Sequence, residues 1–127
     1  MIFIIDDDEA TRDSLRLLLE CAGLEARGFP SPGGFLDGWR SGEEDCMVLD
    51  IHMPGMNGLD LLERLRQRGD EVPVIVVTGR PSPASTARAR AAGAFAVLEK
   101  PFEAGEILAL VRRAMKARPQ PGPRPAR

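Results

Sequence analysis

Short apolar segments alternate with helical patterns along the chain. Four segments are mostly continuous apolar runs, which are typical of strands buried on both faces of a sheet, and 26–29 is a further candidate strand. We therefore expect strands at residues 2–5, 26–29, 46–49, 72–77 and 95–98.

Helical periodicity follows each of these segments. The clearest case is the stretch in which Leu15, Leu18, Leu19 and Ala22 recur at i, i+3, i+4 and i+7, before a capping Gly23. Further helices are expected over 32–40, where two glycines weaken the pattern, in a stretch ending at Gly69, from about Ala84 to Gly93, and around 107–114. Five strands alternating with five helices predict an α/β fold with helices on both faces of a parallel sheet.

The length and composition fit one globular domain followed by a tail. The chain has 127 residues, of which 43% are hydrophobic and 28% charged. Residues 119–127 read PQPGPRPAR and contain too much proline to build a core. We assign 1–116 to the domain and 117–127 to a proline-rich, disordered tail or linker.

Charge and apolar content exclude several functional classes. The formal net charge is −2, from 17 basic and 19 acidic side chains, so the domain itself is not expected to bind nucleic acid or an anionic membrane. No apolar run approaches the roughly 20 residues that span a bilayer. Met1 leads directly into a predicted strand, which leaves no room for a signal peptide, so we expect a cytoplasmic protein.

Two cysteines give no indication of a metal site. Cys21 and Cys46 do not form a CxxC pair and have no nearby histidine, so zinc is not expected. Each lies in an apolar stretch, and we expect both to be reduced core residues.

Polar residues collect where the predicted strands end. Acids at 6–8 follow the first strand, Asp50 ends the third, Thr78 ends the fourth and Lys100 follows the fifth. Ligands of open parallel sheets bind beyond the carboxyl ends of the strands, so these side chains are expected at one edge. Acids there can also cap a helix, which is the alternative role of Asp8 or Glu9.

This set of residue types fits a phosphoryl-transfer site. Clustered carboxylates favour Mg²⁺, which prefers oxygen ligands. An aspartate can attack phosphorus and form an acyl phosphate. The transferred group spreads negative charge over three oxygens, which an ammonium such as that of Lys100 and a hydroxyl such as that of Thr78 can stabilise. The simplest reading of each residue alone, a turn threonine or a surface lysine, does not account for the whole set.

The sequence resembles the receiver domain of bacterial two-component response regulators. The matching motifs are IIDDDE at 4–9, VLDIHMPGMNG at 48–58, VIVVTG at 74–79 and LEKPF at 98–102. The last two look most like the receivers of transcription regulators related to nitrogen-fixation control. The resemblance covers about residues 1–116 and implies a doubly wound, flavodoxin-like sheet with strand order 2-1-3-4-5.

The resemblance also implies a metal site around the acceptor. Asp50 matches the phosphoacceptor, Asp7 the direct Mg²⁺ ligand and Asp6 the acid that holds the metal through water. The backbone carbonyl of His52 would complete the protein ligands. Mg²⁺ is therefore the implied cofactor.

The switch residues follow from the same resemblance. Thr78 matches the switch hydroxyl and Lys100 the phosphate-pairing lysine, which precedes a commonly cis proline, Pro101. The position three residues before the lysine often holds Tyr or Phe but is Val97 here. Phe95 would face the same side as Val97 by strand alternation, and its simplest role is in the core.

The resemblance implies a signalling switch rather than an enzyme. A sensor histidine kinase would phosphorylate Asp50, and the face formed by the fourth helix, fifth strand and fifth helix would then favour another partner or a homodimer. Self-phosphorylation and self-dephosphorylation would be its only chemistry, and we expect His52 and Arg80 to influence the lifetime of the phosphoryl group. The proline-rich tail could end the protein or lead to a DNA-binding domain.

Three alternatives remain open at this stage. A haloacid-dehalogenase-like phosphatase would use Asp6 as its nucleophile, but it leaves the MPGMNG turn unexplained. A flavodoxin-like FMN binder would need a phosphate-cradling loop and flanking aromatic residues, which the sequence lacks. A degenerate receiver acting only as a binding module fits poorly with the complete set of acids, threonine and lysine.

Overall fold

The computed structural model describes residues 1–32, 39, 41–42, 44–52 and 57–117. The elements follow in the order β1 (Ile2–Ile5), α1 (Glu9–Cys21), β2 (Ala26–Phe29), β3 (Cys46–Asp50), α2 (Gly58–Gln67), β4 (Val74–Thr78), α3 (Pro83–Ala91), β5 (Ala96–Glu99) and α4 (Ala104–Ala117). All five predicted strands are present, although β4 and β5 are displaced by one or two residues from the apolar runs that predicted them.

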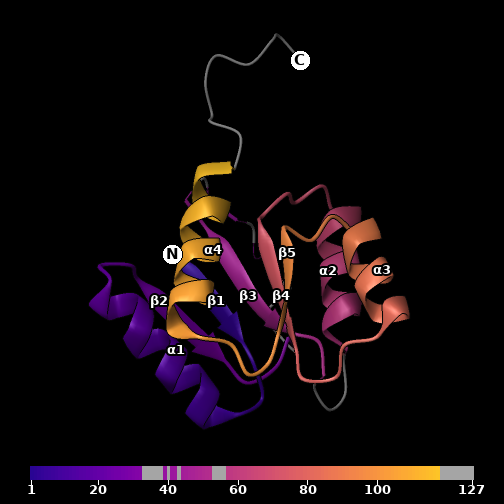
Figure 1. The fold of residues 1–127 in the computed structure, drawn as a ribbon. Helices are drawn as coiled ribbons and strands as arrows, with labels where there is room; N and C mark the ends of the chain where they lie inside the picture. The colour runs from indigo at the N-terminus through magenta and orange to yellow at the C-terminus, as the bar shows by residue number, and fades with distance from the viewer. Residues whose placement is uncertain (33–38, 40, 43, 53–56, 118–127) are drawn as a thin grey trace, which may run out of the picture.

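The five strands form one parallel sheet in the order β2-β1-β3-β4-β5. Asp50 pairs with Val77, and Thr78 pairs with Glu99, so neighbouring strands end close to the same level. Helices cover both faces of the sheet (Figure 1). The predicted α/β class, parallel pairing and strand order are therefore confirmed.

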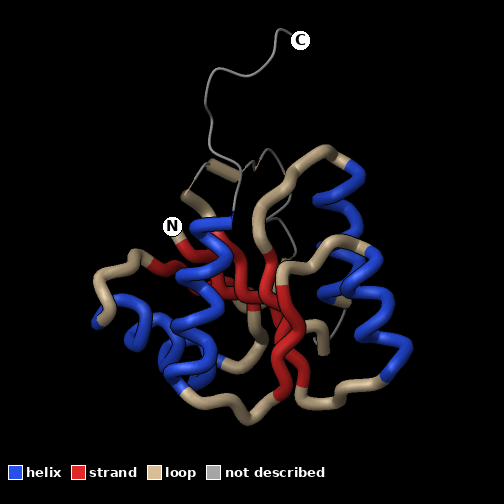
Figure 2. The backbone as a smooth tube through the Cα atoms, turned by 45° about the horizontal axis from the view of Figure 1, so that its top comes forward, coloured by secondary structure: helices blue, strands red, loops and turns tan. Residues whose placement is uncertain are grey.

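Strand alternation divides the apolar side chains into two cores. In β1, Ile2 and Ile4 face the core covered by α1 and α4, whereas Phe3 and Ile5 face the core covered by α2 and α3. The strands form a central layer with helices on either side of it (Figure 2). Because both faces are covered, β1, β3 and β4 are buried throughout, as their continuous apolar runs predict.

Side-chain caps and glycines fix the helix ends. Asp8 caps α1, Asn57 caps α2 and Ser82 forms a capping box with Ser85 at the start of α3. Gly93 ends the turn after α3 with φ +83°, a left-handed conformation that favours glycine. The first three helices thus end next to the glycines that predicted their ends, Gly23, Gly69 and Gly93.

The described residues contain four helices rather than the expected five. The helix predicted over 32–40 falls mostly on residues outside the described part of the chain, while the described Trp39 is not helical. The predicted domain boundary near residue 116 stays a prediction, since 118–127 also lie outside it.

Two side-chain predictions are wrong. Cys21 is exposed, and only Cys46 is a core residue. Phe95 packs against the α1/α4 core, whereas Val97 packs against the α2/α3 core, so the two do not face the same side. Phe95 precedes the first residue of β5, where the alternation of a strand does not yet apply. Its expected core role holds, since it packs against a core cluster while partly buried.

No helix within the described ranges is long and apolar enough to cross a membrane.

Candidate functional site

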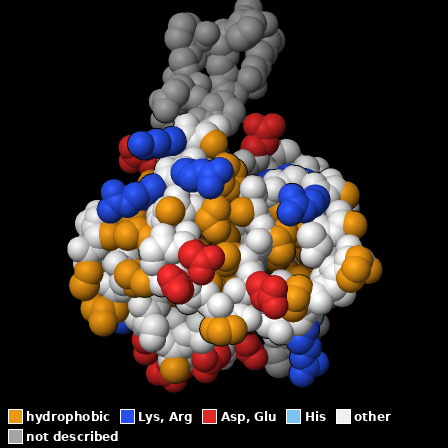
Figure 3. Space-filling model, viewed as in Figure 1, with side chains coloured by type: hydrophobic (Ala, Val, Ile, Leu, Met, Phe, Trp, Pro, Cys, Tyr) orange, Lys and Arg blue, Asp and Glu red, His pale blue; other side chains and the backbone are white. Residues whose placement is uncertain are grey.

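The ends of three strands bring buried polar side chains to one edge of the sheet. Asp6 follows β1, Asp50 ends β3 and Thr78 ends β4, and their exposed fractions are 3%, 6% and 1%. Acidic side chains gather at the lower edge of the molecule in Figure 3, the edge toward which the strands run in Figure 1. Buried carboxylates are costly unless they are paired or bind a cation, so this edge is the candidate site.

Three carboxylates form a cluster that suits a divalent cation. Asp6, Asp7 and Asp50 each offer an oxygen, and these oxygens all lie within 4.8 Å of one another. Hard oxygen ligands with one exposed member, Asp7, fit Mg²⁺, which keeps several waters. Asp8 is outside the cluster and accepts hydrogen bonds from Thr11 as the cap of α1, which lowers the pKa of its carboxyl. The capping alternative therefore applies to Asp8 alone among these acids.

Lys100 places its ammonium group between two of the clustered acids. Its Nζ donates to Asp6 Oδ2 at 3.1 Å and to Asp50 Oδ2 at 3.3 Å. Burial alone would lower the pKa of Lys100, but hydrogen bonds and charges from both acids outweigh burial and raise it. The peptide bond to Pro101 is cis, as the resemblance implied. The cation partly compensates two carboxylates that would otherwise repel each other.

The environment of Asp50 makes its carboxylate more basic. Burial raises its pKa above the ordinary value of 3.8, and the charge of Asp6 adds to the rise. The His52 backbone N–H, which donates to Asp50 Oδ1 at 2.9 Å, and the charge of Lys100 offset part of it. A poorly solvated carboxylate with a raised pKa is a better nucleophile than an ordinary aspartate.

The hydroxyl of Thr78 is engaged by His52 and Arg80. Its Oγ1 accepts from the Arg80 backbone N–H at 3.0 Å and shares a hydrogen bond of 2.8 Å with His52 Nε2. The Lys100 backbone N–H donates to the Thr78 carbonyl, so the two residues are neighbours across β4 and β5. Thr78 thus lies next to the acidic cluster while its hydroxyl bonds elsewhere.

The structure adds contacts that the sequence did not indicate. Arg12 of α1 donates to the Asp6 carbonyl at 2.8 Å and so fixes the chain where β1 ends. Between α2 and α3, Arg88 donates to Asp60 and Glu63, which holds the pKa of Glu63 below its usual value. The Arg88 contacts join residues 25 and 28 positions apart, and no local pattern could have found them.

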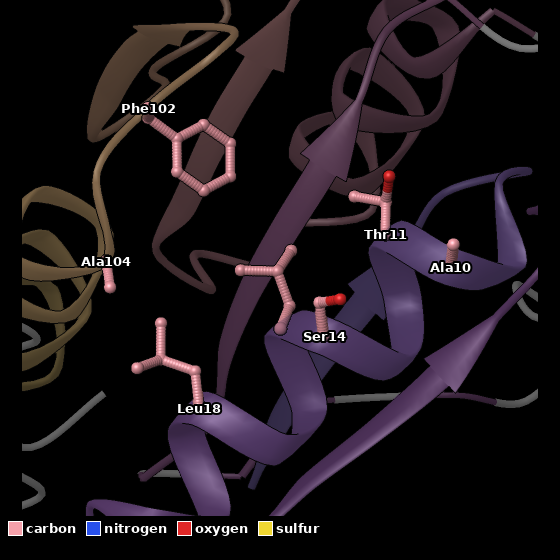
Figure 4. Close-up of a pocket in the computed structure, with 7 residues that line it drawn as sticks. Ala10, Thr11, Ser14, Leu18, Phe102 and Ala104 are labelled. Atoms are coloured by element: carbon pink, nitrogen blue, oxygen red, sulfur yellow. The ribbon is translucent and has the colours of Figure 1, made fainter.

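An apolar groove of about 400 Å³ lies between α1 and the loop leading into α4. Thr11, Ser14 and Leu18 of α1 face Phe102 and Ala104 across it (Figure 4). A second hollow, lined by Thr11, Lys100, Pro101 and Phe102, continues from this groove toward the candidate site.

Curated relatives match this chain over most of its length. The chain is 41% identical over 114 residues to the transcriptional regulatory protein FixJ of Azorhizobium caulinodans, which covers 90% of the chain and 54% of FixJ. It is 40% identical over 113 residues to the DNA-binding transcriptional regulator NtrC of Klebsiella pneumoniae, covering 89% of the chain and 24% of NtrC. The chain spans about half the length of the FixJ relatives.

Solved structures share the fold described above. The response regulator StyR superposes with a TM-score of 0.84 at 37% identity, covering 92% of this chain and 59% of StyR. The FixJ-N crystal structure superposes with a TM-score of 0.80 at 32% identity, covering 91% and 93%. The model of the response regulator receiver domain family matches residues 2–112. The chain therefore belongs to this family and is the receiver domain of a two-component response regulator.

Proposed function

We propose that Asp50 accepts a phosphoryl group from a sensor histidine kinase and that the acyl phosphate switches the domain between two states. The observation that carries this proposal is the buried Asp50 carboxylate, which has a raised pKa and is paired with Lys100 inside the three-carboxylate cluster. The family supports a kinase partner.

In the transfer step, an oxygen of Asp50 attacks the phosphorus of a kinase phosphohistidine. A P–O bond forms to Asp50, the P–N bond breaks, and its electron pair returns to the imidazole nitrogen. Water reverses the modification by attacking phosphorus, which releases inorganic phosphate and the free carboxylate. A small phosphodonor can replace the kinase, so the chemistry proper to this domain is limited to its own phosphorylation and dephosphorylation.

The neighbouring residues stabilise charge on the phosphoryl oxygens. Lys100 already lies 3.3 Å from Asp50 Oδ2 and would pair with one oxygen, and Thr78 would donate its hydroxyl to another. Asp7 would ligate Mg²⁺ directly, Asp6 through water, and Asp50 and the His52 carbonyl would complete the protein ligands. When bound, Mg²⁺ would neutralise the acids and the incoming phosphoryl oxygens.

The groove between α1 and the loop into α4 supports the kinase as donor. It is apolar, the hollow that adjoins it is lined in part by Lys100, and a phosphohistidine would approach Asp50 across this edge. An amphipathic helix of the kinase would lay its apolar side against Leu18 and Phe102.

The signal would be read from α3, β5 and α4, which correspond to the fourth predicted helix, the fifth strand and the fifth predicted helix. A new partner or a homodimer would bind this face once Thr78 engages the phosphoryl group. Val97 replaces the usual aromatic ring there, so we propose a readout that depends on α3 rather than on a moving ring. Because the relatives are longer and named as transcription regulators, we propose a cytoplasmic protein with a DNA-binding output domain beyond this receiver.

Mass spectrometry after incubation with acetyl phosphate and Mg²⁺ tests the proposal. The wild type should gain one phosphate, and Asp50→Asn should gain none. Asp8→Asn is the matched control, because Asp8 lies in the same acidic run but outside the carboxylate cluster, and it should still be phosphorylated. Sedimentation of the same samples reports dimerisation.

The same experiment separates the receiver from a phosphatase of the haloacid-dehalogenase class. If Asp6→Asn abolished the covalent phosphate while Asp50→Asn retained it, the phosphatase would be favoured. We also propose that His52 and Arg80 influence the lifetime of the phosphoryl group, because both lie at the mouth of the site. Unchanged dephosphorylation rates in His52→Ala and Arg80→Ala would contradict this.

A further inference from the structure

The only histidine of the chain joins the acceptor to the switch threonine. The His52 backbone N–H donates to Asp50 Oδ1 at 2.9 Å, while its ring nitrogen Nε2 lies 2.8 Å from Thr78 Oγ1 and 3.3 Å from the Arg80 carbonyl oxygen. The imidazole is thus held by Thr78, the last residue of β4, and by Arg80, two residues beyond it.

The two contacts of Nε2 favour the tautomer in which this nitrogen carries the proton. A carbonyl oxygen can only accept, so a protonated Nε2 satisfies both Arg80 and Thr78. Thr78 Oγ1 also accepts from the Arg80 backbone N–H at 3.0 Å, which occupies both of its acceptor positions. These two donors hold the hydroxyl oxygen against residues 52 and 80.

We infer that the His52 side chain is a positioning residue that retains Thr78 in its resting place and sets how readily the acyl phosphate recruits it. This inference rests on the proposed phosphorylation of Asp50. Thr78 is 1% exposed whereas His52 is exposed, so water can replace the threonine as partner of the imidazole but reaches the hydroxyl poorly. The hydroxyl therefore leaves His52 only for another polar group, and an oxygen of the phosphoryl group is such a partner.

Binding of beryllofluoride with Mg²⁺, followed by ¹⁹F NMR, tests this coupling. His52→Phe keeps a flat ring but removes the donor, and it should tighten binding about two- to tenfold, the effect of one neutral hydrogen bond. His52→Gln carries an amide nitrogen at nearly the reach of Nε2 and should restore the wild-type affinity. In the Thr78→Val background there is no hydroxyl for His52 to retain, so His52→Phe should not change the affinity for beryllofluoride.

An unchanged affinity in His52→Phe, or an equal tightening with and without the Thr78 hydroxyl, would overturn the inference while leaving phosphorylation of Asp50 intact. If the wild type and Asp50→Asn bound beryllofluoride equally poorly, the proposed function would fail and this inference with it. The two failures are therefore distinguishable.

The ¹⁵N signals of the single imidazole give a second readout at fixed pH. In the free wild type, Nε2 should carry the proton. Thr78→Val should shift the Nε2 signal, and adding beryllofluoride to the wild type should shift it in the same direction. An Nε2 signal that responds to neither change would overturn the inference, because a purely structural role predicts no such shared response.

Discussion

The helices α3 and α4 flank β5 from opposite faces of the sheet but are held in different ways. α4 buries Ile107, Val111 and Ala114 in the core that it shares with α1. α3 buries Ala89 alone. It also contacts β5, and ion pairs and hydrogen bonds link it to α2. The difference indicates that α4 is fixed more firmly to its face of the sheet than α3 is.

Two arginines, one on each helix, link α3 to α2 through polar contacts. Arg88 reaches from α3 to the carboxylates of Asp60 and Glu63 on α2. Arg66 reaches from α2 to the carbonyls of Ala92 and Gly93, which follow α3. Exposed ion pairs contribute little to stability, so α3 can shift at a lower cost than α4.

Ile107→Ala should give the largest loss of stability. Its side chain is fully buried, and removing it leaves a cavity in the core between α1, α4 and the sheet. We expect a loss of about 2–5 kcal/mol in the free energy of unfolding. Urea unfolding followed by the fluorescence of Trp39, the only tryptophan, measures it, since Trp39 packs edge-on against Phe3 at 5.2 Å between ring centroids.

The matched change in α3 is Ala89→Gly, which removes the one buried side chain of that helix. We expect a loss of roughly 1 kcal/mol, mainly from the lower helix propensity of glycine. Equal losses in the two variants would contradict the difference between α3 and α4.

Gly58→Ala tests whether α2, the helix to which α3 is attached, is itself fixed to β3. A Cβ there would lie 2.5 Å from the Asp50 carbonyl oxygen and 2.8 Å from Ile51 Cα, which are backbone atoms that cannot turn aside. Alanine normally favours a helix, but overpacking should prevail and cost about 1–3 kcal/mol. Gly105→Ala in α4, where a Cβ meets no atom within 4 Å, is the control and should not destabilise. A stable Gly58→Ala would mean that α2 can shift away from β3.

Asp50→Asn should raise the free energy of unfolding, by an amount smaller than the losses expected for the variants above. Because burial raises the pKa of Asp50, the folded protein binds this proton more tightly than the unfolded chain, and the charge costs stability above the raised pKa. The advantage of Asp50→Asn should be present at neutral pH, shrink as the pH falls through the raised pKa, and vanish below the ordinary value of 3.8.

Urea unfolding across this pH range measures the difference between the two proteins. Asp13→Asn, which removes an exposed carboxylate of α1, is the control and should leave the free energy of unfolding at neutral pH nearly unchanged. If Asp50→Asn instead lowered the free energy of unfolding, the charged Asp50 side chain would stabilise the fold, as the side chains of the two cores do.

The parts of the molecule that follow local rules were predictable from sequence. Continuous apolar runs gave the buried strands, and acids directly after them gave the cluster of Asp6, Asp7 and Asp50, because parallel strands end at one edge. The prediction that Cys21 is a core residue was wrong. Cys21 lies two residues beyond the buried Leu19, which places it about 200° away around the helix axis, on the exposed side.

The attachment of α3 could not be predicted in the same way. Arg88 and Glu63 are 25 residues apart, and their contact depends on how two helices are rotated against each other. The contact between His52 and Thr78 likewise depends on where a loop carries an imidazole after β3 ends. Sequence patterns indicate which side a residue faces within one element, but they do not give contacts between elements.

Arg88→Gln should have the smallest effect on global stability and a selective effect on α3. The variant removes the charged partner of Asp60 and Glu63 while keeping a long polar side chain. We expect faster amide hydrogen exchange in α3 with little change in α4, measured at low ionic strength. Added salt should reduce the difference between variant and wild type, because it screens the exposed pairs.

Acid provides a second way to weaken the same contact. The pKa of Glu63 is held below its ordinary value of 4.5 by Arg88, so the pair contributes above that value and is lost as the pH falls through the lowered pKa. Exchange in α3 of the wild type should therefore approach that of Arg88→Gln at acid pH. Arg90→Gln, the same charge change in the same helix, is the control, since Arg90 is exposed. If it loosened α3 as much as Arg88→Gln, the net charge of the helix, and not its attachment to α2, would control its mobility.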